Sequence, residues 1–322
     1  MASVYPTRGR TAWILAQRPP RPAVPDPYAP HGVFLERERL SSGAVSDSGV
    51  VLLTNRECPW RCLMCDLWKD TTRDSVPEGA IPRQVEIAVR TWSDQGALPV
   101  QVKLYNSGSF FDPAAIPPAD YAPVARHIAF ARHVVVESHP LLVGDRARVL
   151  RDLLPGSLEV AMGLETAHPQ VLEKLNKKFD LAQFARAAEF LAAEKIALRA
   201  FLLVNPPFLD EGSGLEWTVK SAEFAFGCGA GVVALIPTRM GNGALERLRE
   251  TGDFAQPTLA MLEAAQRAAL ALGRGRVFAD TWALEAFSAC PHCFGARRER
   301  LEKVNWTQRD EPPVHCDVCG GS

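Results

Sequence analysis

The stretch Val50–Trp68, which reads VVLLTNRECPWRCLMCDLW, decides the fold and holds the first candidate site. It begins with the unbroken apolar run Val50 to Leu53, which predicts a β-strand buried on both faces. The strand leads into a polar loop that carries Cys58, Cys62 and Cys65. Three thiolates with this spacing can converge on one centre, and such a set suits an iron-sulfur cluster or zinc.

The choice between the two metals depends on a fourth ligand. Structural zinc takes four ligands, but the nearest histidines in the sequence, His31 and His127, lie outside the loop. We therefore interpret the loop as the site of a cluster that is held by three thiolates and has one open iron. The alternatives are a zinc knuckle closed by a distant residue and three unrelated cysteines.

The composition predicts a globular protein of the cytoplasm. The chain has 322 residues, of which 47% are hydrophobic and 23% charged, enough for one large domain or a domain with an appendage. No apolar run approaches the roughly 20 residues of a membrane span, and the N-terminus lacks a hydrophobic signal core. Seven of the 8 cysteines fall in CxxxCxxC and CxxC groups, which favours metal ligation over disulfides. The net charge of -1 provides no overall basic field for nucleic acid.

Residues 1–47 form an extension rich in proline and arginine. The stretch RPPRP at residues 18–22 is followed by further prolines, and no helical period is visible. We expect an extended arm packed on the domain. The alternative is that its arginines contact an anionic substrate. These arginines are Arg8, Arg10, Arg18, Arg21, Arg37 and Arg39.

From Val50 onward, apolar strands alternate with helical segments. Apolar residues at helical spacing predict a helix over residues 85–92, a second helical region over 121–132, and a third that begins after an N-cap at Asp180. Short strands separated by helices argue for a parallel sheet with right-handed crossovers. The six predicted strands are residues 50–53, 100–105, 133–136, 158–162, 198–204 and 231–236.

Polar, glycine or proline residues follow each predicted strand, and their position indicates the architecture. In an α/β barrel the carboxyl ends of the strands meet at one mouth, where catalysis occurs. Six strands make a partial (β/α)6 TIM-like barrel, which we place at residues 48–282. A doubly wound open sheet is the alternative, although it would normally offer a glycine-rich nucleotide turn where this chain has its cysteines.

A second cysteine group lies in the tail, residues 283–322. Four thiolates in two CxxC knuckles, 22 residues apart, predict a closed tetrahedral site for structural zinc. An auxiliary iron-sulfur cluster would use the same ligands. Between the knuckles there are few apolar residues, so we expect the metal to fold this tail. The four ligands are Cys290, Cys293, Cys316 and Cys319.

The motif Cys58-x-x-x-Cys62-x-x-Cys65 after the first barrel strand resembles the signature of the radical S-adenosylmethionine (SAM) superfamily. The resemblance covers about residues 48–245, and the superfamily's six-stranded partial barrel matches the predicted layout. It implies that the three cysteines bind a 4Fe-4S cluster whose fourth iron is chelated by SAM. It also implies an electron donor such as flavodoxin or ferredoxin, and reductive cleavage of SAM to a 5′-deoxyadenosyl radical.

The same resemblance suggests SAM contacts at the ends of the next three strands. Asn106, Ser107 and Gly108 stand where the superfamily has a Gly-Gly-Glu-like turn that holds the methionyl amine, although the acidic residue is absent here. Glu137 and Glu165 resemble polar residues that bind the ribose or the methionyl group. A surface or salt-bridge role is the alternative for both glutamates.

Longer stretches resemble the family of the archaeosine-forming radical SAM protein. They are NRECPWRCLMCDLW (55–68), KLYNSGSFFDP (103–113), GLET (163–166) and FLLVNPPF (201–208). More distant resemblances are to the Elongator catalytic subunit and to methylthiotransferases. The family resemblance implies a lyase-type step on a modified nucleoside or tRNA, together with tRNA or a tRNA-modifying partner protein.

The substrate stays open, because the chain shows no separate RNA-binding module and no net positive charge. A radical SAM enzyme acting on a small molecule or peptide is the second hypothesis. A non-catalytic scaffold, in which both cysteine groups hold zinc, is the third.

Overall fold

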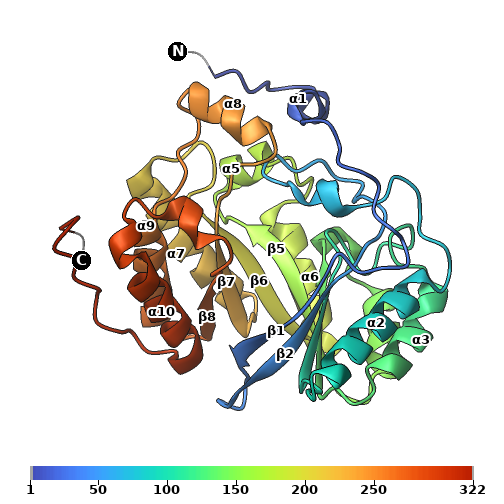
Figure 1. Cartoon of the computed structure of the whole chain (residues 1–322). Helices are drawn as coiled ribbons and strands as arrows, with labels where there is room; N and C mark the ends of the chain where they lie inside the picture. The colour runs from blue at the N-terminus through green and yellow to red at the C-terminus, as the bar shows by residue number, and fades with distance from the viewer. Residues whose placement is uncertain (1–2, 321–322) are drawn as a thin grey trace.

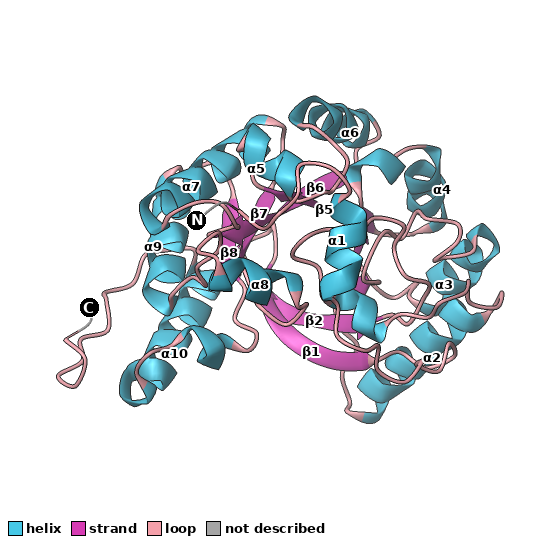
Figure 2. Cartoon of the chain, turned by 90° about the horizontal axis from the view of Figure 1, so that it is seen from above, coloured by secondary structure: helices cyan, strands magenta, loops and turns pink. Residues whose placement is uncertain are grey.

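The strands form one sheet of 8 strands. Each strand pairs with the next one in the chain, from β1 to β8. The computed structural model describes residues 3–320. β1 (Gly32–Arg39) pairs antiparallel with β2 (Val45–Leu52), and every later pairing is parallel. The sheet curls around its inner face and helices cover the outer face (Figures 1 and 2). The later strands are β3 (Gln101–Tyr105), β4 (His133–Ser138), β5 (Ser157–Glu165), β6 (Ala197–Val204), β7 (Val232–Pro237) and β8 (Arg276–Ala279).

Most crossovers contain helices that pack against the sheet. In chain order, with α1 before the sheet and α10 after it, the helices are α1 (Arg10–Gln17), α2 (Ala80–Asp94), α3 (Tyr121–His127), α4 (Asp145–Leu153), α5 (Pro169–Lys174), α6 (Leu181–Ala193), α7 (Glu211–Gly227), α8 (Ala244–Glu250), α9 (Leu259–Ala271) and α10 (Pro291–Thr307). Four short 3-10 helices are η1 (Leu67–Asp70), η2 (Pro118–Asp120), η3 (Pro140–Leu142) and η4 (Leu284–Phe287). Over residues 3–320, none of the helices has the length and apolar character needed to span a membrane.

The predicted helices are found, with one difference in length. Asp180 is the N-cap of α6, and it forms a capping box in which its carboxylate accepts a hydrogen bond from the Gln183 amide at 2.7 Å. The helical region expected over residues 121–132 is shorter, because α3 ends at His127 and a turn continues to β4.

The six predicted strands correspond to β2 through β7, and the partial barrel is confirmed. β1 and the short β8 were not predicted. The expectation of an extended arm without helix is wrong for part of residues 1–47, since α1 and β1 lie there. The β1 sequence GVFLERER does alternate, but the face that turns inward carries Glu36 and Glu38, so its pattern resembles a solvent-exposed segment.

The inner glutamates of β1 are neutralised by cations of the barrel interior. The Lys103 ammonium bonds to the carboxylates of both Glu36 and Glu38, and Arg199 Nη2 lies 2.6 Å from Glu38 Oε1. Burial opposes the charge of Lys103, but Glu38 and Glu36 outweigh it and hold the lysine pKa above its usual value. Paired charges of β1, β3 and β6 therefore occupy this part of the barrel interior.

α10 closes the gap between the two edge strands. The side-chain amide of Asn305 donates to the Ala279 carbonyl and accepts from the Ala279 amide, both at 2.8 Å. Gln308 makes the same pair of bonds to Val277, at 2.6 and 2.9 Å. On the other side, Trp306 Nε1 donates to the Arg37 carbonyl of β1 at 3.2 Å. Side chains thus satisfy the β8 edge that a closing strand would otherwise occupy.

This contact makes α10 a part of the barrel packing. Leu301 and Val304 are 0% and 1% exposed, and Leu301 belongs to the main hydrophobic core. The tail therefore buries apolar side chains against β1 and β8 rather than forming a core of its own. Only the segment after the helix, residues 308–319, depends on other contacts.

Candidate active site and metal centre

The loop after β2 follows the carboxyl end of that strand, at the end of the parallel sheet where α1 and α8 also lie (Figure 1). Its backbone is fixed by two other segments, one at Leu175 and Asn176 and one at Asn242. The Leu63 amide donates to the Leu175 carbonyl at 2.9 Å, and Asn242 Nδ2 donates to the Leu63 carbonyl at 2.6 Å. Asn176 Nδ2 donates to the Arg61 carbonyl at 2.7 Å. The loop is thus a rigid part of the mouth.

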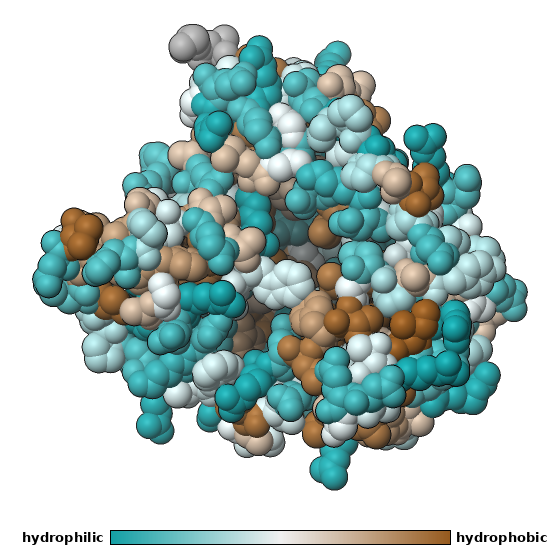
Figure 3. Space-filling view, in the orientation of Figure 1, coloured by the Kyte–Doolittle hydropathy of each residue, from teal (hydrophilic) through white to brown (hydrophobic). Residues whose placement is uncertain are grey.

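A second, smaller core packs around this loop. It joins the N-terminal segment to α5, α8 and the centre of the cysteine loop, with Leu63 fully buried at 0% exposure. Its buried members are Tyr5, Ile14, Leu63, Val171, Leu175, Leu203, Ala244, Leu245, Leu248 and Phe254. Figure 3 shows the molecular surface hollowed near its centre, between α8 and the β1–β2 hairpin. The mouth is therefore covered from above and open from the side.

The thiols of Cys58, Cys62 and Cys65 share one electrostatic environment. Burial raises the pKa of each thiol to about 12. Each also feels another thiol of the set, which raises the pKa further: Cys65 acts on Cys58, Cys58 on Cys62, and Cys62 on Cys65. The three side chains are half-buried, and thiols that act on one another in this way ionise together only if a cation compensates them, as a bound metal would.

The turn after β3 lies directly against this loop. A methyl group added at Gly108 would lie 3.2 Å from Cys58 Cβ, so the turn needs glycine there to come so close. Ser107 has a φ of 54°, and both polar atoms of the buried Asn106 side chain lack a hydrogen-bond partner. Buried polar atoms that lack a partner are uncommon, and this turn has two of them in one side chain.

The acidic residue that is missing from this turn is supplied by β4. The Glu137 carboxylate accepts hydrogen bonds from the Asn106 amide and from the Gly108 amide, the latter at 3.3 Å. Burial raises the pKa of Glu137 to about 7, although these backbone bonds oppose the shift. Glu137 is therefore brought to the predicted turn and lies at the mouth rather than on the outer surface.

Glu165 forms a buried ion pair, the salt-bridge role that was its alternative, and the partner is Lys177, which the sequence analysis did not name. Lys177 Nζ lies 2.6 Å from Glu165 Oε1, and the two side chains are 9% and 10% exposed. Glu165 is held in the left-handed region with a φ of 66°. Burial opposes the charge of Lys177, but Glu165 and then Cys62 raise its pKa above the usual value. Lys177 is thus a cation shared between a carboxylate and the cysteine loop.

The position of Lys177 depends on His139 and Trp60. His139 Nδ1 accepts a hydrogen bond from the Leu141 amide at 3.2 Å, so Nε2 carries the proton and donates to the Lys177 carbonyl at 2.8 Å. The Trp60 ring of the cysteine loop stacks on His139, with ring centroids 3.6 Å apart. These contacts tie β4, the cysteine loop and the Lys177 segment together.

The four tail cysteines come together as predicted. Their sulfur atoms all lie within 4.8 Å of one another; Cys290, Cys293 and Cys316 are buried and Cys319 is exposed. The backbone amides of Cys319 and Val318 lower the pKa of Cys316 to about 7. Four convergent sulfurs, of which the Cys316 thiol ionises most easily, can form a tetrahedral metal site.

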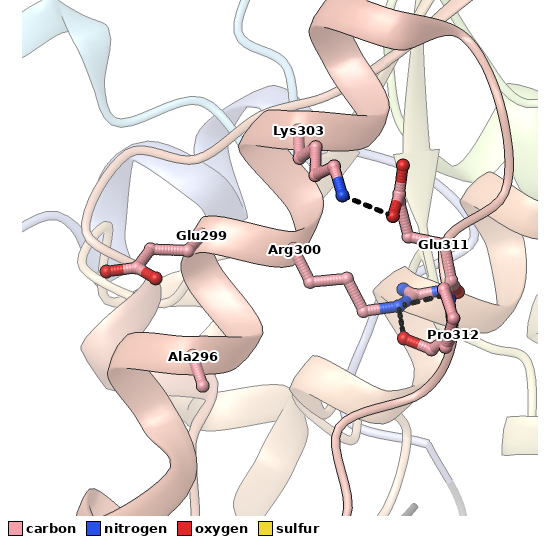
Figure 4. A pocket seen from close by; sticks show the side chains of 6 residues that line it. All are labelled: Ala296, Glu299, Arg300, Lys303, Glu311 and Pro312. Carbon is pink, nitrogen blue, oxygen red and sulfur yellow. Dashed lines mark hydrogen bonds and ion pairs between the residues drawn. The ribbon is translucent and has the colours of Figure 1, made fainter.

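A groove on the outside of α10 has no comparable chemistry. Figure 4 shows Arg300 and Lys303 turned towards Glu311 and Pro312, whereas Glu299 points away from them. Arg300 Nη2 donates to the Glu311 carbonyl at 2.6 Å, and Lys303 Nζ lies 2.7 Å from Glu311 Oε2. It is lined by Ala296, Glu299, Arg300, Lys303, Glu311 and Pro312. Because Arg300 and Lys303 are already bonded to Glu311, we do not assign a ligand to this groove.

Solved structures identify the class of fold. The archaeal Elp3 of Methanocaldococcus infernus is 12% identical, with a TM-score of 0.50 over 62% of this chain and 51% of that chain. Methylornithine synthase (PylB) is 14% identical, with a TM-score of 0.51 over 69% of this chain and 61% of that chain. Both are radical SAM enzymes, so the predicted fold class is confirmed: a partial barrel of radical SAM type with a tail that carries four cysteines.

Sequence relatives support the closer resemblance. An uncharacterised protein of Methanocaldococcus jannaschii is 22% identical over 308 residues, which is 88% of this chain and 83% of that protein. Archaeosine synthase subunit beta of Thermococcus kodakarensis is 33% identical over 124 residues, 37% of this chain and 38% of that subunit. The Methanosarcina acetivorans subunit is 25% identical over 231 residues, 68% of this chain and 66% of that subunit. No protein-family model matches the chain.

Proposed function

We propose that this chain is a radical SAM enzyme whose Cys58, Cys62 and Cys65 thiolates hold a 4Fe-4S cluster. The observation that carries the proposal is a three-thiol loop fixed across the mouth of a radical SAM-type barrel, with unsatisfied polar groups next to it. When bound, the cluster and SAM would supply a 5′-deoxyadenosyl radical on one-electron reduction by a donor such as flavodoxin or ferredoxin. The protein residues bind and orient these groups.

The charges at the mouth suit the methionyl end of SAM. An ammonium group requires an anionic acceptor, and Glu137 presents a carboxylate whose pKa of about 7 allows ionisation when a cation approaches. A carboxylate requires a cation, and Lys177 is a buried ammonium beside the thiols. We assign Glu137 to the methionyl amine and Lys177 to the methionyl carboxylate. Glu165 orients Lys177 and remains a candidate for the ribose hydroxyls.

The turn at Asn106, Ser107 and Gly108 completes this proposed SAM site. Its amide groups hold Glu137 in place, and the free Asn106 side chain has one donor and one acceptor for a ligand. Gly108 allows the turn to approach Cys58. The turn has no acidic residue of its own, and Glu137 of the neighbouring strand β4 supplies the carboxylate.

Metal analysis tests the cluster against the zinc-scaffold alternative. In anaerobically purified protein, about four irons and four sulfides per chain should be lost when Cys58, Cys62 and Cys65 are all changed to alanine. The matched control is Cys228→Ala, which removes a partly exposed thiol outside both groups. An iron content that does not fall in the triple variant, or zinc in place of iron in the wild type, would contradict the proposal.

For the substrate, we propose a lyase-type step on a modified nucleoside or tRNA, acting with tRNA or a tRNA-modifying partner. The support is the similarity to two subunits named archaeosine synthase subunit beta. A gel-shift with bulk tRNA at several salt concentrations tests it, because binding through phosphates must weaken as salt rises. Absence of salt-dependent binding, with unchanged tRNA nucleosides in a deletion strain, would favour a small molecule or peptide substrate.

For the tail, we propose a structural zinc held by its four cysteines. The closed set of sulfurs within 4.8 Å supports a site without an open position. An auxiliary iron-sulfur cluster at the same residues is the alternative. The two differ in whether replacing one tail cysteine releases zinc alone or iron and sulfide together.

A further inference from the structure

Three guanidinium groups converge on the carboxylate of Glu57, the residue before Cys58. Arg18 Nη1 lies 2.7 Å from Glu57 Oε1, Arg61 Nε lies 3.3 Å from the same oxygen, and Arg21 bonds to Oε2. The exposed fractions of the arginine side chains are 10%, 24% and 15% in that order, and that of Glu57 is 14%. Three cations and one anion leave an excess of two positive charges in a poorly solvated position.

This arginine cluster, defined as Arg18, Arg21, Arg61 and Glu57, is built into the cysteine loop from both sides. Arg61 donates to the carbonyl groups of Cys58 and Trp60, the latter at 3.0 Å. Arg18 and Arg21 come from the N-terminal segment, where their guanidinium carbons lie 4.6 and 5.5 Å from the centre of the Trp68 ring. The excess charge is thus held in place by hydrogen bonds and an aromatic face.

The field of this cluster reaches the metal-binding thiols. Arg18 acts electrostatically on Cys65 and Arg61 on Cys62, each lowering the thiol pKa, while Asp66 acts on Cys65 more strongly and in the opposite sense. The other charges near the thiols are largely offset, since Lys177 is paired with Glu165 and Asp66 faces Lys69 and Arg239. Asp112 acts on Cys58 as a further anion. The unpaired positive charge at the loop therefore comes from the arginine cluster.

We propose that the arginine cluster raises the reduction potential of the centre bound by Cys58, Cys62 and Cys65, and this rests on the proposed function. A 2+ cluster held by the three thiolates would carry a net charge of −1, and one electron taken from an external donor, which is oxidised in turn, would make that charge −2. Fixed positive charge favours the more negative state. Arg18, Arg21 and Arg61 are thus positioning residues of the loop that also make its cofactor easier to reduce.

Redox titration without SAM, followed by the electron paramagnetic resonance signal of the reduced cluster, tests the proposal. At one fixed potential, Arg18→Gln should lower the ratio of reduced to oxidised cluster about tenfold, a shift of about 59 mV for one electron. Glu57→Gln should shift the potential in the opposite direction. The matched control is Arg10→Gln, which removes a charge from the same segment where it pairs with the exposed Glu173.

The sign of the two shifts separates an electrostatic role from a structural one. Loosening the loop would move both variants in the same direction, so equal or absent shifts in iron-replete protein would overturn the proposal. If Arg18→Gln loses iron, Arg21→Lys and Glu57→Gln decide: the first must keep the wild-type potential and the second must raise it. Wild-type protein that binds no iron would instead refute the proposed function, and with it this inference.

Discussion

Replacing Lys177 with methionine separates the structural and the binding roles of the Glu165–Lys177 pair. Both side chains are about nine-tenths buried and their charged atoms are 2.6 Å apart. Removing the lysine leaves the Glu165 carboxylate buried and unpaired, which should cost about 3–5 kcal/mol of unfolding free energy. The double variant Lys177→Met, Glu165→Leu removes both charges and should recover most of that loss, since two apolar side chains can pack in place of the pair.

Across these variants, SAM affinity should not change in parallel with the free energy of unfolding. In our proposal the Lys177 ammonium meets the methionyl carboxylate, so the single and the double variant should both bind SAM at least about tenfold more weakly. Urea unfolding measures the free energies, and anaerobic calorimetry with the iron-loaded proteins measures SAM affinity. A stable double variant that binds SAM like the wild type would refute the assigned role of Lys177. If Lys177→Met alone is as stable as the wild type, the Glu165–Lys177 pair is not buried from solvent as described.

Three further predictions concern the barrel seam, the tail and the mouth. Asn305→Leu should cost about 1–3 kcal/mol, because it leaves backbone groups of the β8 edge unsatisfied, and it should increase aggregation measured by light scattering; unchanged stability and solubility would count against the seam. Cys316→Ser should release about one zinc per chain and make residues 309–320 protease-sensitive, while hydrogen exchange around Leu301 and Val304 stays slow; iron and sulfide lost together would identify an auxiliary cluster instead. Because burial raises the pKa of Glu137 to about 7, ionising it costs stability as pH rises from about 4.5 to 7, and a proton competes with SAM below 7. SAM affinity should therefore fall as pH drops through 7 in the wild type, and an identical profile in Glu137→Gln would contradict this.

The strands that the sequence predicted correctly are those whose local pattern matches their burial. β2 through β7 are short apolar runs followed by polar turns, because helices cover their outer faces. β1 was missed because its inward face carries Glu36 and Glu38, whose partners Lys103 and Arg199 lie 65 and 161 residues away from Glu38. Such a long-range pairing has no local signature in one sequence.

The parts of the candidate site that were predicted are those carried by residues close together in the sequence. Both cysteine groups follow from spacing, and the tail cysteines do come together. Lys177 was missed because it precedes the exposed Lys178 and the two appear to be a solvated pair; the one signal was its alternation with the buried Leu175 and Phe179. The role of Glu137 at the turn of the neighbouring strand depends on parallel strand order, which becomes visible only in three dimensions.

We propose above all that the three-cysteine loop supports reductive cleavage of SAM. The most direct measurement is the release of 5′-deoxyadenosine from SAM by the anaerobically reconstituted protein with dithionite as reductant. We predict its formation in the wild type and in Cys228→Ala, and its loss when Cys58, Cys62 and Cys65 are replaced with alanine in a chain that keeps its barrel fold by circular dichroism. Release of 5′-deoxyadenosine by that triple variant, or none from an iron-loaded wild type, would contradict the account.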